Sequence, residues 1–142
     1  MVAEGHYDLL PNYDQLPEEP GMAWSMHTEA RIFTRFMLYL LELKGLSAET
    51  YQTKLSKHSD FNFGPDSKRP PYPIYMGMSL QIMETPFGKS FSHSGNNCDF
   101  VCMFEVYKDR KMGYVFFTNS NTAFKLLGDL RQFLVEGKIK MQ

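Results

Sequence analysis

A ten-residue stretch from Phe91 to Phe100 holds the side chains in this chain that are best suited to chemistry. It places an imidazole, a hydroxyl and a glycine in succession, at His93, Ser94 and Gly95, between two segments with the composition of strands. On a strand edge, the imidazole and the hydroxyl can donate hydrogen bonds to a bound acyl group, and the glycine lets that group approach the backbone. The tripeptide therefore predicts one wall of an acyl-binding site.

The same residues also fit a purely structural interpretation. His93 can be a strand histidine that a neighbour satisfies, and Asn96 and Asn97 can form a turn, because asparagine tolerates left-handed backbone geometry. The other histidines, His6, His27 and His58, form no shared motif and receive no role.

Two helices are predicted ahead of this stretch. The first follows a cap at Ser25 or Thr28 and stops at Gly45. Its apolar residues recur at helical spacing, as Ile32, Phe33, Phe36, Met37, Leu40 and Leu41. A second, weaker helix starts at Ser47 and fades near Lys57.

About four strands and a last helix are predicted to complete the fold. The strands are expected at Ile74–Met83, Ser90–Ser94, Phe100–Tyr107 and Met112–Thr118, with the last two forming the clearest hairpin. Asn119-Ser120-Asn121 is expected to cap the terminal helix, whose apolar face carries Phe124, Leu127, Leu130 and Leu134. The prediction is α+β, an antiparallel sheet of about four strands with flanking helices. Residues 1–142 are expected to form one domain, with an extended loop over 1–24, helices over 25–57, and the sheet and terminal helix over 73–142.

Composition excludes several classes of function. The chain has 142 residues, 43% of them hydrophobic and 15% aromatic, which is typical of one packed domain. A formal net charge of −1 gives no broad attraction to nucleic acid or to a membrane surface. The longest apolar stretch, Phe36–Leu43, is too short to cross a bilayer. The opening segment Met1–His6 is polar, unlike a signal peptide, and the sequence does not indicate a cellular compartment.

The two cysteines indicate neither a disulfide nor a metal site. Cys98 and Cys102 would lie on one face of a strand with Cα atoms ~13 Å apart, too far to bridge. No histidine or further cysteine stands at metal-ligand spacing, so no metal and no other cofactor is expected.

The order of several motifs resembles the C-terminal part of the class C type of the serine β-lactamase and penicillin-binding-protein-like family. Gly21–Phe33 is similar to the family phrase that opens a helix, and Tyr75–Met78 stands where the family has Tyr-Gly-x-Gly, with the second glycine lost. His93–Gly95 stands where the family has His/Lys-Thr/Ser-Gly, and is followed by Asp99-Phe100. Gly113–Asn119 is similar to the family's last strand. The resemblance covers nearly all of the chain.

This resemblance implies an acyl-transfer site in a β-lactamase/transpeptidase-like fold. By position, it makes His93 the basic group and Ser94 the hydroxyl donor on the third-motif wall. Gly95, Asn96 and Asn97 would contact substrate, and the backbone N–H of Asn96 would help to form the oxyanion hole. Full-length relatives in this family are often periplasmic or secreted.

The chain departs from the family where the nucleophile should be. No lysine has a serine three residues before it, the nearest imitation being Thr122–Lys125, and no tyrosine has an asparagine two residues after it. Because acyl transfer needs an activated nucleophile, the chain is expected to be the C-terminal portion of a serine hydrolase, inactive alone. The alternative is a non-catalytic binding or interaction module that kept the wall of the site. A small molecule or a peptide remains a possible ligand, and the substrate, whether β-lactam, peptide or ester, stays open.

The strand Met112–Thr118 indicates how the chain could associate. In the family, strands from the N-terminal end of the chain complete the sheet next to it, so its apolar edge Tyr114–Phe117 is expected to have unpaired backbone groups here. Such an edge is a template for another strand. A homo-oligomer, or a complex with a complementary N-terminal chain, is therefore predicted.

Overall fold

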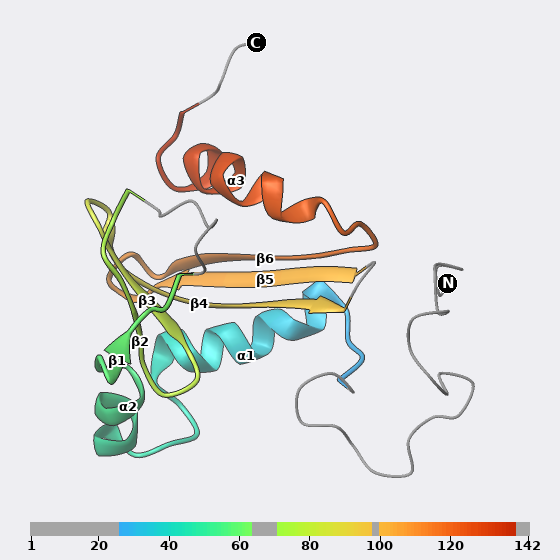
Figure 1. Ribbon diagram of the computed structural model, residues 1–142. Coiled ribbons are helices and arrows are strands. Elements are labelled where there is room, and N and C mark those ends of the chain that lie inside the picture. Colours follow the sequence, from blue (N-terminus) through green and yellow to red (C-terminus); the bar gives the residue numbers. More distant parts are fainter. Residues whose placement is uncertain (1–25, 64–70, 98–99, 139–142) are drawn as a thin grey trace.

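The computed structural model describes residues 26–63, 71–97 and 100–138, so the extended loop predicted over 1–24 lies outside the described part. The fold is α+β, as predicted. A single antiparallel sheet has its strands in chain order, and helices lie on both of its faces (Figure 1). The strands are β1 (Ser59–Asp60), β2 (Ile74–Met76), β3 (Gln81–Thr85), β4 (Gly88–Asn97), β5 (Phe100–Tyr107) and β6 (Met112–Thr118). The helices are α1 (Ala30–Glu42), α2 (Ala48–Lys54) and α3 (Leu126–Leu134), with short 3-10 turns at η2 (Lys108–Arg110) and η3 (Ala123–Lys125).

The prediction of about four strands was wrong, because the described residues form a sheet of six. One of the additional strands arises where the predicted strand Ile74–Met83 folds into a hairpin, β2 and β3, that turns at residues 77–80. The Gly77 N–H donates to the Leu80 carbonyl at 2.8 Å, and Ser79 takes a left-handed φ of 68°. A Cβ on Gly77 would lie 2.8 Å from the Lys54 carbonyl oxygen, so only glycine fits there. The other is the short β1, which pairs with β2.

The predicted hairpin of Phe100–Tyr107 with Met112–Thr118 is confirmed at both of its bounds. β4 begins at Gly88, two residues before the predicted start at Ser90, and runs three residues beyond the expected end at Ser94. Thr85 fixes the tight β3–β4 turn, since its hydroxyl donates to the Gly88 carbonyl at 2.7 Å and accepts from the Phe87 N–H at 3.1 Å.

The helix ends only partly follow the predicted caps. Helix α1 begins after Glu29 with no side-chain cap, so the predicted cap at Thr28 is wrong, and Ser25 lies outside the described residues. It ends at Glu42, and its C-cap Leu43 takes the left-handed conformation two residues before the predicted stop at Gly45. Helix α2 has its predicted cap, since the Ser47 hydroxyl accepts from the Thr50 N–H at 3.1 Å.

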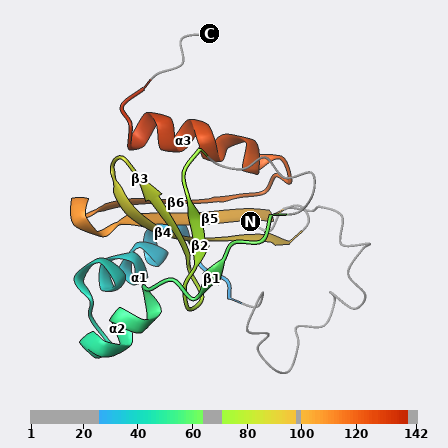
Figure 2. The same cartoon turned by 60° about the vertical axis from the view of Figure 1, so that its left-hand side comes forward.

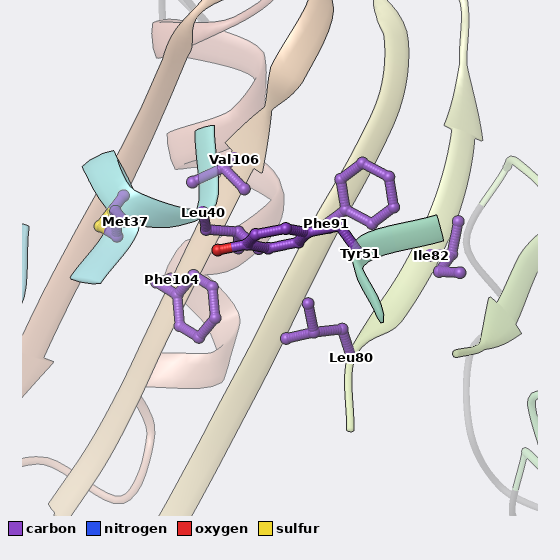
Figure 3. Close-up of a cluster of buried hydrophobic side chains, with 8 residues drawn as sticks. All are labelled: Met37, Leu40, Tyr51, Leu80, Ile82, Phe91, Phe104 and Val106. Atoms are coloured by element: carbon purple, nitrogen blue, oxygen red, sulfur yellow. The ribbon is translucent and has the colours of Figure 1, made fainter. Parts of the chain in front are cut away.

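Helices α1 and α3 pack on opposite faces of the sheet (Figures 1 and 2). On the α1 side, the main core gathers Met37, Leu40, Tyr51, Leu80, Ile82, Phe91, Phe104 and Val106 (Figure 3). On the α3 side, a smaller cluster joins Tyr107, Tyr114 and Val135. The apolar face predicted for the last helix was wrong in part, because Phe124 and Leu134 are exposed while Leu130 packs on the sheet.

Within the described residues, no helix combines the length and the apolar character that crossing a membrane requires.

Candidate functional site

The predicted wall of the acyl-binding site lies on the part of β4 that extends beyond the end of β3. β3 pairs with β4 only from Gly88 to Ser92, whereas β5 pairs with β4 as far as Asn97. From His93 to Asn97, therefore, one backbone edge of β4 has no strand beside it among the described residues. Alternate residues of such a segment direct an N–H and a carbonyl outward, where an extended ligand can pair with them.

His93 and Ser94 point to opposite faces of the sheet, because successive strand residues alternate. His93 pairs with Phe104, whose side chain belongs to the α1-side core, whereas Ser94 pairs with Met103. A ligand can contact both side chains only at the open edge that they share. The geometry thus favours a ligand that lies along this edge over one that sits on either face.

The structure also tests the purely structural interpretation of these residues. The His93 side chain is exposed and has no hydrogen-bond partner in the described part of the chain, so no described neighbour satisfies it. The turn suggested for Asn96 and Asn97 is wrong, since both are strand residues, paired with Val101 and Phe100.

Gly95 has a packing reason to be glycine besides access for a ligand. It pairs with Cys102 across β4 and β5, and a Cβ on Gly95 would lie 3.0 Å from the Cys102 sulfur. Cys102 is a free, half-buried thiol. The packing of β4 against β5 is therefore one reason for a glycine at this position, besides access for a ligand.

A cleft of about 550 Å³ lies at the other end of β4. Its walls come from α2, from the first residues of β4 and from η2, and they include Tyr51, Lys89, Phe91 and Lys108. His93, Ser94, Gly95 and Asn96 are not among its lining residues. The acyl-binding site expected at His93–Gly95 thus stays a prediction.

Sequence reasoning missed a buried polar cluster on the α3 face of the sheet. Glu105 on β5 is fully buried, and its carboxylate accepts two hydrogen bonds from Arg131 on α3, one from Nε and one from Nη2, both 3.1 Å long. The Tyr114 hydroxyl donates to the same carboxylate at 2.6 Å, and the Tyr107 hydroxyl at 3.2 Å. Four donors thus satisfy both oxygens, which a buried carboxylate requires.

The cluster changes the acidity of its members. Burial, followed by the charge of Glu105, raises the pKa of Tyr107 to about 12 and raises the pKa of Tyr114 as well. Burial lowers the pKa of Arg131, but the charge of Glu105 and its hydrogen bonds outweigh burial and leave that pKa raised. Both tyrosines therefore stay neutral donors at physiological pH. The sequence carried a signal, because Glu105 is the one charged residue in the otherwise apolar run of β5.

Among the described residues, no three histidine, cysteine, aspartate or glutamate side chains come together as a metal site would require. No protein-family model matches the chain, and none of the curated proteins matches it.

Proposed function

We propose that this chain provides the third-motif wall of an acyl-transfer site, the C-terminal portion of a β-lactamase-related serine hydrolase. The open edge of β4 at His93–Asn97 is the observation that carries the proposal. A substrate acyl group pairs with this edge, and His93 and Ser94 donate to it from either side of the strand.

The nucleophile and its base come from sequence outside these 142 residues. Ser94 is half-buried, and no lysine stands three residues after any serine of the chain, so nothing at the required spacing would deprotonate a serine hydroxyl. The chain by itself therefore binds an acyl compound without turning it over.

Titration of the ¹⁵N-labelled chain with benzylpenicillin tests the binding step. We expect chemical-shift changes at the amides of His93–Asn97. The change His93→Ala removes one exposed donor and should weaken binding about 3- to 10-fold, the value of one hydrogen bond. Lys89→Ala is the matched control, because Lys89 lies on the same face of β4 but where β3 covers the edge. Shifts centred on the cleft beside Lys89, or no shifts at all, would contradict the proposal.

Turnover of nitrocefin and of p-nitrophenyl acetate tests the missing nucleophile. We expect neither compound to be hydrolysed by the purified chain. Saturable hydrolysis that Ser94→Ala abolishes would show that the nucleophile is present. The DNA upstream of the coding region gives an independent check, since an in-frame Ser-x-x-Lys is expected there.

The missing nucleophile also favours a second candidate, a non-catalytic binding module. In that case benzylpenicillin still perturbs His93–Asn97, but no upstream reading frame carries a nucleophile motif. The two functions share the open edge and differ in whether chemistry follows binding.

A further inference from the structure

The two outer edges of the sheet are protected to different degrees. β1 is two residues long, and an ion pair between Lys57 and Asp60 lies at its end. Short edge strands with charges resist pairing with other chains. β6, at the opposite edge, is seven residues long and contains no charged residue between Met112 and Thr118. It pairs with β5 on one side and with no strand of the described chain on the other.

Apolar side chains lie next to the open edge of β6. Phe117 is 36% exposed, and its ring meets the Phe33 ring of α1 edge-on, with centroids 5.7 Å apart. The neighbouring Phe36 is 45% exposed and packs against Phe33 at 5.3 Å. The unpaired backbone is thus bordered on the α1 face by a half-exposed aromatic cluster, made of Phe33, Phe36 and Phe117.

We propose that the β6 edge of the 142-residue chain binds the β6 edge of a second copy, in antiparallel pairing about a two-fold axis at Val115. This register pairs all seven strand residues, and any shift leaves some unpaired. It keeps side chains on matching faces, as an axis perpendicular to the sheet requires.

The residues that this register brings together are compatible. Phe117 lies opposite Gly113 of the second copy, which has no side chain to oppose the ring. Tyr114 lies opposite the second copy's Phe116 on the other face, an aromatic pair that stabilises strand pairing. Lys111 lies opposite the second copy's Asn119, so no like charges meet. This placement of charge favours a second copy as the occupant.

Paired backbone alone buries too little surface for a stable dimer, which needs roughly 800 Å² from each partner. The aromatic cluster adds apolar area to the interface, because a two-fold axis at Val115 brings the cluster of each copy to the same side of the joined sheet. The proposal does not depend on acyl-transfer chemistry.

Analytical ultracentrifugation of the 142-residue chain, from low micromolar to near-millimolar concentration, tests the association. We expect a monomer–dimer equilibrium. Phe117→Lys places a charge on the edge and should weaken dimerisation by at least about tenfold. Leu38→Lys is the control, since Leu38 is 51% exposed but on the far side of α1 from Phe33. A monomer at every concentration, or a dimer that Phe117→Lys leaves intact, would overturn the proposal.

Disulfide cross-linking tests the register without relying on Phe117→Lys to fold. In a chain with Cys98→Ser and Cys102→Ser, Val115→Cys should form a covalent dimer on mild oxidation, because its sulfur faces its own copy across the axis. Thr118→Cys should not, since the two residues 118 lie about 20 Å apart along the paired strands. Efficient cross-linking of Thr118→Cys but not of Val115→Cys would exclude this interface.

Discussion

The two faces of the sheet hold their helices in different ways. On one face, α1 buries Met37 and Leu40 in a cluster of side chains that are all apolar except for the hydroxyl of Tyr51. On the other, α3 has no fully buried residue of its own, and Arg131 reaches from it to the carboxylate of Glu105. Apolar packing holds the first helix, whereas the second combines a directional ion pair with the apolar contact of Leu130.

This difference shows what each kind of contact specifies. Apolar burial stabilises in proportion to area and fixes orientation only through shape, so α1 can adjust by small shifts. A bidentate guanidinium–carboxylate pair permits a narrow range of geometry. The pair therefore determines where α3 lies along β5 and β6, although that helix contributes little apolar surface.

Loss of the arginine should be the most damaging change on either face. Arg131→Met leaves the Glu105 carboxylate buried with only the two tyrosine donors, which we expect to lower the free energy of unfolding by about 3–5 kcal/mol. Urea denaturation followed by circular dichroism measures it. Arg35→Met is the control, because Arg35 is exposed on α1.

A double variant separates the cost of leaving a buried charge unpaired from the cost of losing the arginine side chain. Glu105→Leu combined with Arg131→Met removes both charges and should recover part of the lost stability, since only the tyrosine hydroxyls remain unsatisfied. A double variant that is less stable than Arg131→Met alone would show that the ion pair is not what positions α3.

On the apolar face, Leu40→Ala should cost about 3 kcal/mol, because it opens a cavity among packed side chains that cannot fully close. Leu40 is 4% exposed, and Leu38, two residues away on the same helix, is 51% exposed. Leu38→Ala should therefore change stability by less than about 0.5 kcal/mol. Equal losses in the two variants, measured by urea denaturation, would mean that α1 does not pack through this face.

The sequence predicted the elements whose signal is local. The hairpin of β5 and β6 has long apolar strands and a polar connection, and both of its bounds were predicted. Ser47 capped α2 as predicted, because a cap depends on residues three apart. The β2–β3 hairpin was missed, since the Lys54 carbonyl, which leaves room only for glycine at Gly77, comes from a distant part of the sequence.

The candidate site shows the same limit. His93–Gly95 could be placed on a strand from its pattern, but the open edge depends on where β3 stops pairing, which is tertiary information. The Glu105 cluster was missed for a related reason. Its signal, one carboxylate in an apolar strand, predicts a buried partner but does not say that Arg131 is the partner.

High pH should weaken the α3 face selectively. Burial, and then the charge of Glu105, raises the pKa of Tyr107 from 10.0 to about 12. Between these values the unfolded chain has released the tyrosine proton while the folded chain retains it, so stability falls as pH rises. The stability that Tyr107 contributes through its raised pKa is fully present below pH 10 and is lost as the pH approaches about 12. Tyr114, whose pKa is also raised, acts in the same direction.

Tyr107→Phe removes one of these titrations, and its stability should fall less steeply between pH 10 and pH 12 than that of the unaltered chain. Urea denaturation at stepped pH measures the two slopes, and tyrosinate absorbance follows the ionisation. The slope is the informative quantity, because loss of the hydrogen bond to Glu105 lowers stability at every pH. Tyr39→Phe is the control, since Tyr39 is 55% exposed on α1. Parallel slopes for Tyr107→Phe and the unaltered chain would mean that Tyr107 is not held neutral by the α3 face.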